Sequence, residues 1–144
     1  MGRWLGFDHV DCRVISLAAV EPFYDALMPE LGLAEKRLSQ VDDAGEWHEA
    51  SDGRPYNTVE YFEPARDGAV PFFIGFIERR DHVPALTRIA FRVERERFDE
   101  LESLLGRIGA VAIERSEDMS AYPAIFFEDP AGTKLELVAR NPAR

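Results

Sequence analysis

The sequence predicts an α+β protein of two βαβββ modules, which together form a curved mixed sheet that lines a cleft and carries its helices on the outer face. Three observations support this prediction. Polar and apolar residues alternate strictly at 9–14, and 88–93 follows the same pattern with the small Ala90 at one of the polar positions, which is typical of half-buried strands. A helical pattern follows each of these segments. TVEYFEP at 58–64 and AIFFEDP at 124–130 also match in pattern and in their closing proline, so the order of elements repeats.

The first module is expected at about residues 6–80. After the opening strand, apolar residues recur at helical spacing between Val20 and Leu31, and Gly32 stands where a helix C-cap is expected. The remaining strands of this module are predicted at Leu33 to about Val41, in the hairpin arm EWHEA at 46–50, at 56–64 and at 70–78, with the turn DDAG at 42–45.

The second module is expected at about residues 85–140, and it repeats this order. Its helix is predicted at 95–110, where apolar residues fall on one face and Gly109 marks the end. One module would leave one face of its sheet uncovered, so two modules in a single domain, residues 1–144, are expected to enclose a cleft between those faces. The strands of the second module are predicted at 86–93, 110–115, 122–130 and 132–140.

The alternation also assigns side chains to the two faces of each predicted sheet. Val10, Cys12 and Val14 are expected to pack beneath the helices, and Cys12, the only cysteine, is therefore interpreted as a buried thiol. The residues between them are expected to face the cleft. The cleft-facing set is His9, Asp11, Arg13, Arg88, Ala90, Arg92, Lys134, Glu136 and Val138.

The composition argues against several classes of function. The 144 residues carry a net charge of −10 with an isoelectric point near 4.8, whereas nucleic acids and membrane surfaces attract clustered lysine and arginine. No apolar run reaches the length of a membrane span, and residues 1–10 lack the apolar region and cleavage site of a signal peptide. We therefore expect a soluble cytoplasmic protein that binds a small molecule and neither nucleic acid nor a membrane.

Several segments resemble the vicinal oxygen chelate superfamily, whose members include glyoxalase I, extradiol dioxygenases, methylmalonyl-CoA epimerase and the fosfomycin and bleomycin resistance proteins. The resemblance rests on FDHVDCRV followed by FYDALMPELGL, on RIAFRV, and above all on FFEDPAGTKLEL near the end of the chain. It covers nearly the whole sequence and implies a glyoxalase-like fold. This fold hosts several different reactions, so the resemblance alone does not select one.

The resemblance implies four metal-ligand positions, one on the first and one on the last strand of each module. Two of them fall on His9 and Glu136, whose side chains are both metal-ligand types. The other two fall on Arg88 and near Ile74, which are not. Arg88 would add a fixed positive charge, and sites for Zn, Ni, Mn or Fe generally use three or more protein ligands.

Three alternatives for metal binding at this site therefore remain open. An ordinary site would keep the four implied positions, and a displaced site would borrow Glu60, His48 or Asp11. A metal-free site would rely on side chains alone. In the metal-free alternative, Arg88 would bind a carboxylate, enolate or phosphate oxygen of the ligand.

Each candidate residue also has a purely structural interpretation. Arg88 and Glu136, the two candidate catalytic residues, are interpreted first as a buried salt bridge between adjacent strands. For His9 the alternatives are a hydrogen bond to Asp11 or to the backbone, and a role as metal ligand or general base. Glu60 is expected either in the cleft or exposed at a sheet edge. The candidate ligand-binding residues are Asp11, Arg88, Arg92, Glu60 and Tyr122.

Two functions follow from these features. The first is a glyoxalase-like enzyme of lyase, isomerase or dioxygenase type that acts on a small oxygenated molecule in the cleft, with metal assistance or with Arg88 in the electrophilic role. The second is a binding protein of the bleomycin-resistance type, which holds a small molecule without reacting with it. The resemblance implies a homodimer for both.

Overall fold

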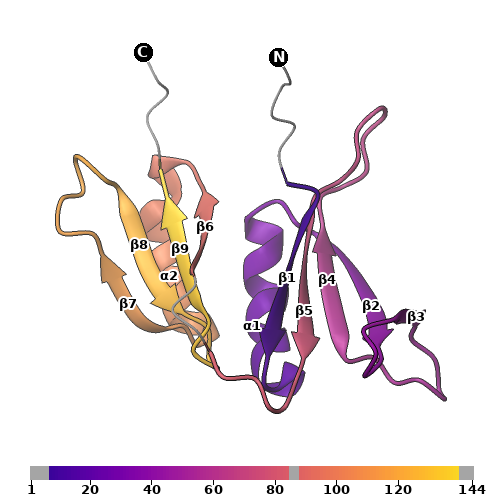
Figure 1. The fold of residues 1–144 in the computed structure, drawn as a ribbon. Helices are drawn as coiled ribbons and strands as arrows, with labels where there is room; N and C mark the ends of the chain where they lie inside the picture. Colours follow the sequence, from indigo (N-terminus) through magenta and orange to yellow (C-terminus); the bar gives the residue numbers. More distant parts are fainter. Residues whose placement is uncertain (1–6, 85–87, 140–144) are drawn as a thin grey trace, which may run out of the picture. The chain divides into compact units, whose positions relative to one another are not determined.

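The computed structural model describes residues 7–84 and 88–139, and it confirms the predicted α+β class (Figure 1). By its contacts the chain divides into two compact units. Unit 1 comprises Met1–Leu17 and Met28–His82, and unit 2 comprises Ala18–Leu27 and Val83–Arg144. Each unit holds one mixed sheet.

Unit 1 contains a five-stranded sheet in the order β1-β5-β4-β2-β3. β1 runs parallel to β5, and the other neighbours are antiparallel. The short strand β3 is the predicted hairpin arm, and it extends the sheet beyond the βαβββ plan. The strands are β1 (His9–Val14), β2 (Glu35–Val41), β3 (Trp47–Glu49), β4 (Thr58–Phe62) and β5 (Phe73–Glu78).

The register of this sheet aligns residues of β1, β5, β4 and β2 side by side. Side chains two residues apart share a face of a sheet, so the aligned residues form rows on one face, which we call the polar face of unit 1. The opposite face carries Ile74, Phe76 and Tyr61, which are buried. The first row consists of His9, Phe73 and Phe62, and the second of Asp11, Gly75, Glu60 and Arg37.

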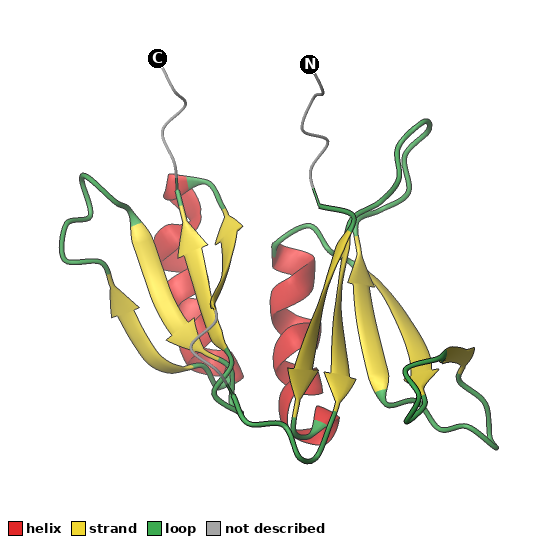
Figure 2. Cartoon of the chain, in the orientation of Figure 1, coloured by secondary structure: helices red, strands yellow, loops and turns green. Residues whose placement is uncertain are grey.

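Unit 2 contains a four-stranded sheet in the order β6-β9-β8-β7, in which β6 runs parallel to β9. Helix α2 lies along one face of this sheet (Figure 2) and buries Phe98, Leu101 and Leu105. Gly109 ends the helix in a left-handed conformation with φ of 96°, as its position predicted. The elements are β6 (Arg88–Arg92), η1 (Arg95–Arg97), α2 (Phe98–Ile108), β7 (Val111–Arg115), β8 (Ala124–Glu128) and β9 (Lys134–Val138).

Helix α1 (Leu17–Glu30) is divided between the units, and its middle, Ala18–Leu27, belongs to unit 2. Within unit 2 the buried Tyr24 hydroxyl donates a hydrogen bond of 2.8 Å to the buried Asp129, at the turn between β8 and β9. Asp129 also accepts hydrogen bonds from the backbone N–H groups of this turn. The carboxylate therefore joins the helix to the turn, with its burial offset by several donors.

The structure differs from the sequence prediction in three details. Within residues 7–84 and 88–139 the strands hydrogen-bond into two sheets rather than one curved sheet, because β1 and β6 each pair along one side only. Helix α2 begins at Phe98 rather than Arg95, since residues 95–97 form a 3₁₀ turn, which is a common start of an α-helix. Cys12 is partly exposed rather than buried, because it lies on the edge strand β1.

None of the helices in the described part of the chain is long and apolar enough to span a membrane.

Replacing Tyr24 with Phe is expected to destabilise the protein by about 1–3 kcal/mol, because the buried Asp129 carboxylate loses its hydroxyl donor. Chemical denaturation measures the change in the free energy of unfolding. Tyr56→Phe is the control, since Tyr56 is 41% exposed, and it is expected to change that free energy by less than about 0.5 kcal/mol. Equal effects of the two substitutions would contradict the role assigned to Tyr24.

Candidate functional site

A continuous stack of aromatic and cationic groups crosses the polar face of unit 1. The rings of His9 and Phe73 are nearly parallel with their centroids 4.6 Å apart, and the Phe73 ring stacks on Phe62 at 4.4 Å. At the other end, the guanidinium carbon of Arg37 lies 4.2 Å from the centroid of Phe62. The three rings follow the first row of the register, and Arg37 reaches Phe62 from the second row. The stack orients both the His9 imidazole and the Arg37 guanidinium.

His9 is also held by two carboxylates. Its Nδ1 donates a hydrogen bond of 2.7 Å to Asp8, and its Nε2 lies 3.5 Å from Asp11 Oδ2. The pKa of His9 is raised chiefly by the hydrogen bond to Asp8; burial lowers it somewhat, and the charges of Asp11, Asp8 and Glu60 raise it further. His9 is hydrogen-bonded, but to Asp8 rather than to Asp11 or the backbone as predicted, because Asp11 is only within ion-pair distance. The role of His9 as a metal ligand stays a prediction.

Two carboxylate side chains reach over Gly75 in the second row. A Cβ atom at this position would lie 2.7 Å from Asp11 Oδ1 and 3.7 Å from Glu60 Cγ, so the glycine leaves the space that Asp11 occupies. Glu60 is 8% exposed, and its Oε1 accepts a hydrogen bond from the Ser39 hydroxyl. The alternative that Glu60 is exposed at a sheet edge is wrong, because β4 lies between β5 and β2 inside the sheet.

The register corrects one of the implied metal positions. In unit 2 the third residue of β6, Ala90, lies opposite Glu136 on β9. In unit 1 the third residue of β1, Asp11, lies opposite Gly75 on β5. The counterpart of Glu136 in unit 1 is therefore Gly75 rather than Ile74. A shift of one residue moves a strand side chain to the opposite face. Ile74 is accordingly buried on the face away from His9 and Asp11.

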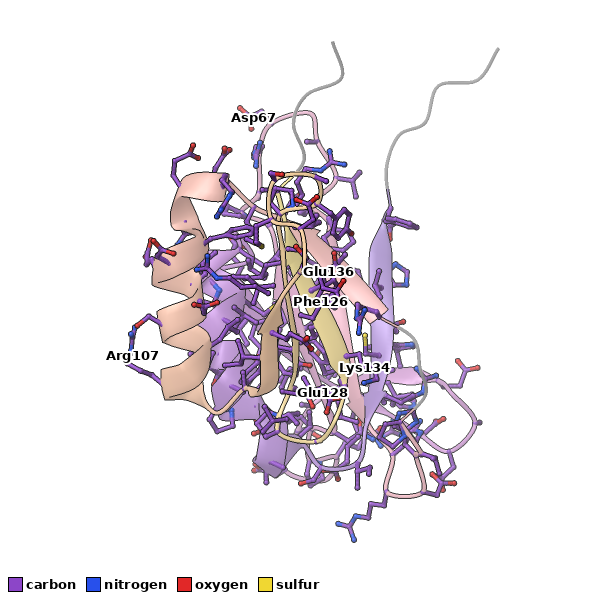
Figure 3. The ribbon with its side chains drawn as sticks, turned by 90° about the vertical axis from the view of Figure 1, so that its left-hand side faces the viewer. Asp67, Arg107, Phe126, Glu128, Lys134 and Glu136 are labelled. Carbon is purple, nitrogen blue, oxygen red and sulfur yellow. The ribbon has the colours of Figure 1, made fainter. Side chains whose placement is uncertain are left out.

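In unit 2 the buried Glu136 is held by a tyrosine rather than by an arginine. Glu136 is 6% exposed on β9, and the Tyr122 hydroxyl donates a hydrogen bond of 2.6 Å to its Oε1. The guanidinium carbon of Arg88 lies 4.8 Å from the ring centroid of Phe126, the residue opposite Glu136 on β8 (Figure 3). The predicted salt bridge between Arg88 and Glu136 is wrong, because Ala90 lies opposite Glu136 on β6.

Arg88 and Arg92 are both exposed on β6. In the part of the chain that the structure describes, neither guanidinium forms a hydrogen bond or an ion pair. Lys134, which lies opposite Arg88, is engaged instead, since its Nζ forms an ion pair of 2.8 Å with Glu128 (Figure 3). Arg88 is therefore a cation on the face of the sheet that also carries Glu136, and the described residues do not neutralise it.

The structure brings the predicted site residues together in two groups. His9, Asp11 and Glu60 share the polar face of unit 1. Unit 2 holds Tyr122 in contact with Glu136, and Arg88 over the neighbouring Phe126, while Arg92 lies further along β6. The cleft between the modules, and any site that combines the two groups, stays a prediction.

The residues at the four implied metal positions do not fit a divalent ion. The side chains of Arg88 and Gly75 offer no metal ligand, and the guanidinium is a permanent positive charge. Within each unit taken by itself, over residues 7–84 and 88–139, no three His, Cys, Asp or Glu side chains are grouped so that they could hold a metal ion.

Sequence reasoning missed a cavity of about 410 Å³ in unit 1. It lies over β2, β3 and β4, and its lining includes Arg37, Ser39, Trp47 and Glu60. The period-two pattern of EKRLSQV at 35–41 could have placed Arg37 and Ser39 on one face. Their position beside Glu60 depends on the pairing of β2 with β4, which the pattern alone does not reveal.

Two mixed sheets of this topology, with two helices, define a glyoxalase-like fold. The chain is similar in structure to the fosfomycin resistance protein FosX from Mesorhizobium loti, at 17% identity and a TM-score of 0.55 over 96% of this chain and 94% of that one. It is also similar to a variant of FosX from Listeria monocytogenes, complexed with Mn(II) and 1S,2S-dihydroxypropylphosphonic acid, at 20% identity and a TM-score of 0.61 over 96% and 93% of the two chains.

A third similar structure is a glyoxalase/dioxygenase from Nostoc punctiforme, at 18% identity and a TM-score of 0.61 over 96% of this chain and 92% of that one. No protein-family model and no curated protein sequence match the chain. These structural likenesses confirm the glyoxalase-like fold of the chain.

The pKa of His9 is expected to lie above 6.5, and Asp8→Asn should lower it more than Asp11→Asn, because the hydrogen bond to Asp8 is the largest cause of the shift. A histidine whose pKa is raised by folding stabilises the fold fully below its unfolded pKa, and this stability is lost as pH rises through the folded pKa. A proton NMR titration measures the pKa, and unfolding at acidic and mildly alkaline pH measures the stability.

Asp52→Asn is the control, because Asp52 is exposed and is not one of the charges that raise the pKa of His9, and it should leave that pKa unchanged. A larger effect of Asp11→Asn than of Asp8→Asn would contradict the assignment of Asp8 as the main partner of His9.

Proposed function

We propose that this protein is a glyoxalase-like enzyme that moves a proton on a small oxygenated anion. The main support is the arrangement in unit 2, where Tyr122 holds the buried Glu136 carboxylate while the Arg88 guanidinium stays outside any ion pair among the described residues. A carboxylate and a guanidinium that do not neutralise each other are both available to a substrate.

Glu136 is the proposed base. The Tyr122 hydroxyl bonds to Oε1 and orients the carboxylate, which leaves Oε2 to accept a proton from a carbon next to a carbonyl group. Arg88 is the proposed electrophilic group, since its N–H groups can donate to the carbonyl oxygen as that oxygen becomes an enolate. Where the deprotonated carbon carries a hydroxyl group, Glu136 then returns the proton to the former carbonyl carbon while a proton moves between the two oxygens of the enediolate, which is an isomerisation. Where the substrate carries a leaving group β to the carbonyl, the enolate expels that group with its bonding electron pair, which is an elimination.

The substrate class follows from the charge of Arg88 and from one of the similar structures. That FosX variant binds 1S,2S-dihydroxypropylphosphonic acid, which is a small oxygenated anion. Arg88 suits an anion of this class, because guanidinium pairs well with carboxylate and phosphonate oxygens. The same FosX structure contains Mn(II), whereas the positions occupied here by Arg88 and Gly75 supply no metal ligand.

A non-catalytic binding protein is the second candidate, and Arg88 and Gly75 also favour it. A protein that only sequesters a small anion needs a complementary charge and a fitting surface, but neither a base nor a metal. The two candidates differ in the fate of the bound molecule, because an enzyme changes it and a binding protein releases it unchanged.

The proposed base is tested by the exchange of carbon-bound protons of a probe for deuterium in D2O. The probes are pyruvate, 2-oxobutyrate and dihydroxyacetone phosphate, and proton NMR follows the loss of their carbon-bound protons. Glu136→Gln is expected to slow the exchange by about 10²–10⁴-fold, the usual contribution of a general base. Arg88→Gln is expected to lower kcat/KM by about 10- to 100-fold, because it removes a charge-assisted hydrogen bond to the developing oxyanion.

Glu117→Gln and Arg107→Gln are the matched controls, since both residues are exposed in the same unit, and both should leave the exchange rate unchanged. Stoichiometric binding of a probe that is recovered without exchange would support the binding protein instead. If no probe binds or exchanges, both candidates fail for this substrate class.

The purified protein is expected to carry less than about a tenth of an equivalent of divalent metal, because two of the four implied positions offer no ligand. After chelation, adding Mn, Zn, Ni or Fe(II) should leave the midpoint of thermal unfolding unchanged. Elemental analysis and thermal unfolding measure the two quantities. Stoichiometric metal that is lost in both His9→Ala and Glu136→Gln would overturn this expectation and identify the two residues as ligands.

A further inference from the structure

The cavity over β2, β3 and β4 contains two opposite charges that do not pair with each other. Arg37 and Glu60 lie directly opposite in the register, where oppositely charged side chains commonly interact. Instead, the Arg37 guanidinium lies over the Phe62 ring and Glu60 Oε1 accepts a hydrogen bond from Ser39. Among residues 7–84 and 88–139, neither the guanidinium nor Glu60 Oε2 forms a hydrogen bond or an ion pair.

These two charges are separated along the sheet. Phe62 is two residues beyond Glu60 on β4, which corresponds to about 7 Å along a strand. The guanidinium of Arg37 is drawn to that end of the cavity, and the Glu60 carboxylate stays at the other end beside Ser39. Glu49 on β3 lies opposite Ser39 and also lines the cavity, so it adds a second carboxylate near the negative end.

Aromatic side chains and the size of the cavity are suited to a small organic molecule. Trp47 and Phe62 both line it, and Trp47 is 44% exposed. A volume of about 410 Å³ falls within the usual range for small-molecule sites. Glu60 is 8% exposed, and its Oε2 is not a buried atom without a partner, so a ligand group that displaces water from this oxygen must itself donate a hydrogen bond.

We propose that this cavity binds a zwitterion of the α-amino acid type with an apolar or aromatic side chain. The carboxylate of the ligand would accept hydrogen bonds from Arg37, its ammonium group would donate to Glu60 and Glu49, and its side chain would contact Trp47. A purely anionic ligand would face the two carboxylates, and a purely cationic one would face the guanidinium. A molecule that carries both charges satisfies both ends of the cavity. The cavity lies wholly in unit 1, so this proposal does not depend on the function proposed for unit 2.

Calorimetric titration of the full chain tests this proposal with L-phenylalanine and its two single-charge analogues, phenethylamine and 3-phenylpropanoate. L-Phenylalanine is expected to bind, and each analogue should bind at least about tenfold more weakly, because it loses one charge-assisted contact. In Arg37→Gln, the affinity for L-phenylalanine should fall to about the affinity that the wild-type protein has for phenethylamine, which lacks the carboxylate. In Glu60→Gln, the affinity for L-phenylalanine should fall to about the affinity that the wild-type protein has for 3-phenylpropanoate, which lacks the ammonium group.

Arg66→Gln and Glu46→Gln are the matched controls, since both are exposed in unit 1 outside the cavity lining, and they should leave the affinity unchanged. Quenching of tryptophan fluorescence by L-phenylalanine should disappear in Trp47→Phe, which locates the site. Arg37 is exposed, so Arg37→Gln remains informative if Glu60→Gln fails to fold.

Three outcomes would overturn the proposal. The first is that L-phenylalanine, L-leucine and L-tryptophan all fail to bind at about 10 mM. The second is that the single-charge analogues bind as tightly as L-phenylalanine, and the third is that Arg37→Gln binds L-phenylalanine like the wild type.

Discussion

The position of every candidate group depends on the register of the strands, above all on the parallel pair at the edge of each sheet. In unit 1 this pairing sets Asp11 opposite Gly75, and in unit 2 it sets Ala90 opposite Glu136. A slip of one residue would carry each polar side chain to the other face. The buried residues between them, such as Leu135 and Leu137 on β9, oppose a slip because it would expose them.

The faces of single strands could be predicted from the sequence, because alternation is a local property of the chain. His9, Asp11 and Arg13 are indeed the more exposed set on β1. Contacts between strands could not be predicted in the same way. The pairing of Glu136 with Tyr122, and the place of Gly75 rather than Ile74, depend on register and on side-chain rotamers that distant segments determine.

One arrangement of side chains occurs in both units, although the strands that supply it differ. A buried glutamate accepts a hydrogen bond from a neutral hydroxyl, and a nearby arginine lies over a phenylalanine ring. In unit 1 the glutamate is Glu60, and in unit 2 it is Glu136. The other members are Ser39, Arg37 and Phe62 in unit 1 and Tyr122, Arg88 and Phe126 in unit 2.

This arrangement keeps charges apart that could otherwise cancel. A hydroxyl donor offsets part of the cost of burying a carboxylate without neutralising it. The ring holds the guanidinium by about 0.5–1 kcal/mol at an exposed site, whereas a hydrogen bond between charged groups contributes about 1.5–3 kcal/mol net. An anionic group brought by a ligand can therefore compete with the ring for the arginine, while the hydroxyl keeps the glutamate in place. Side chains arranged in this way remain available to a ligand, and a salt bridge between them would have removed that availability.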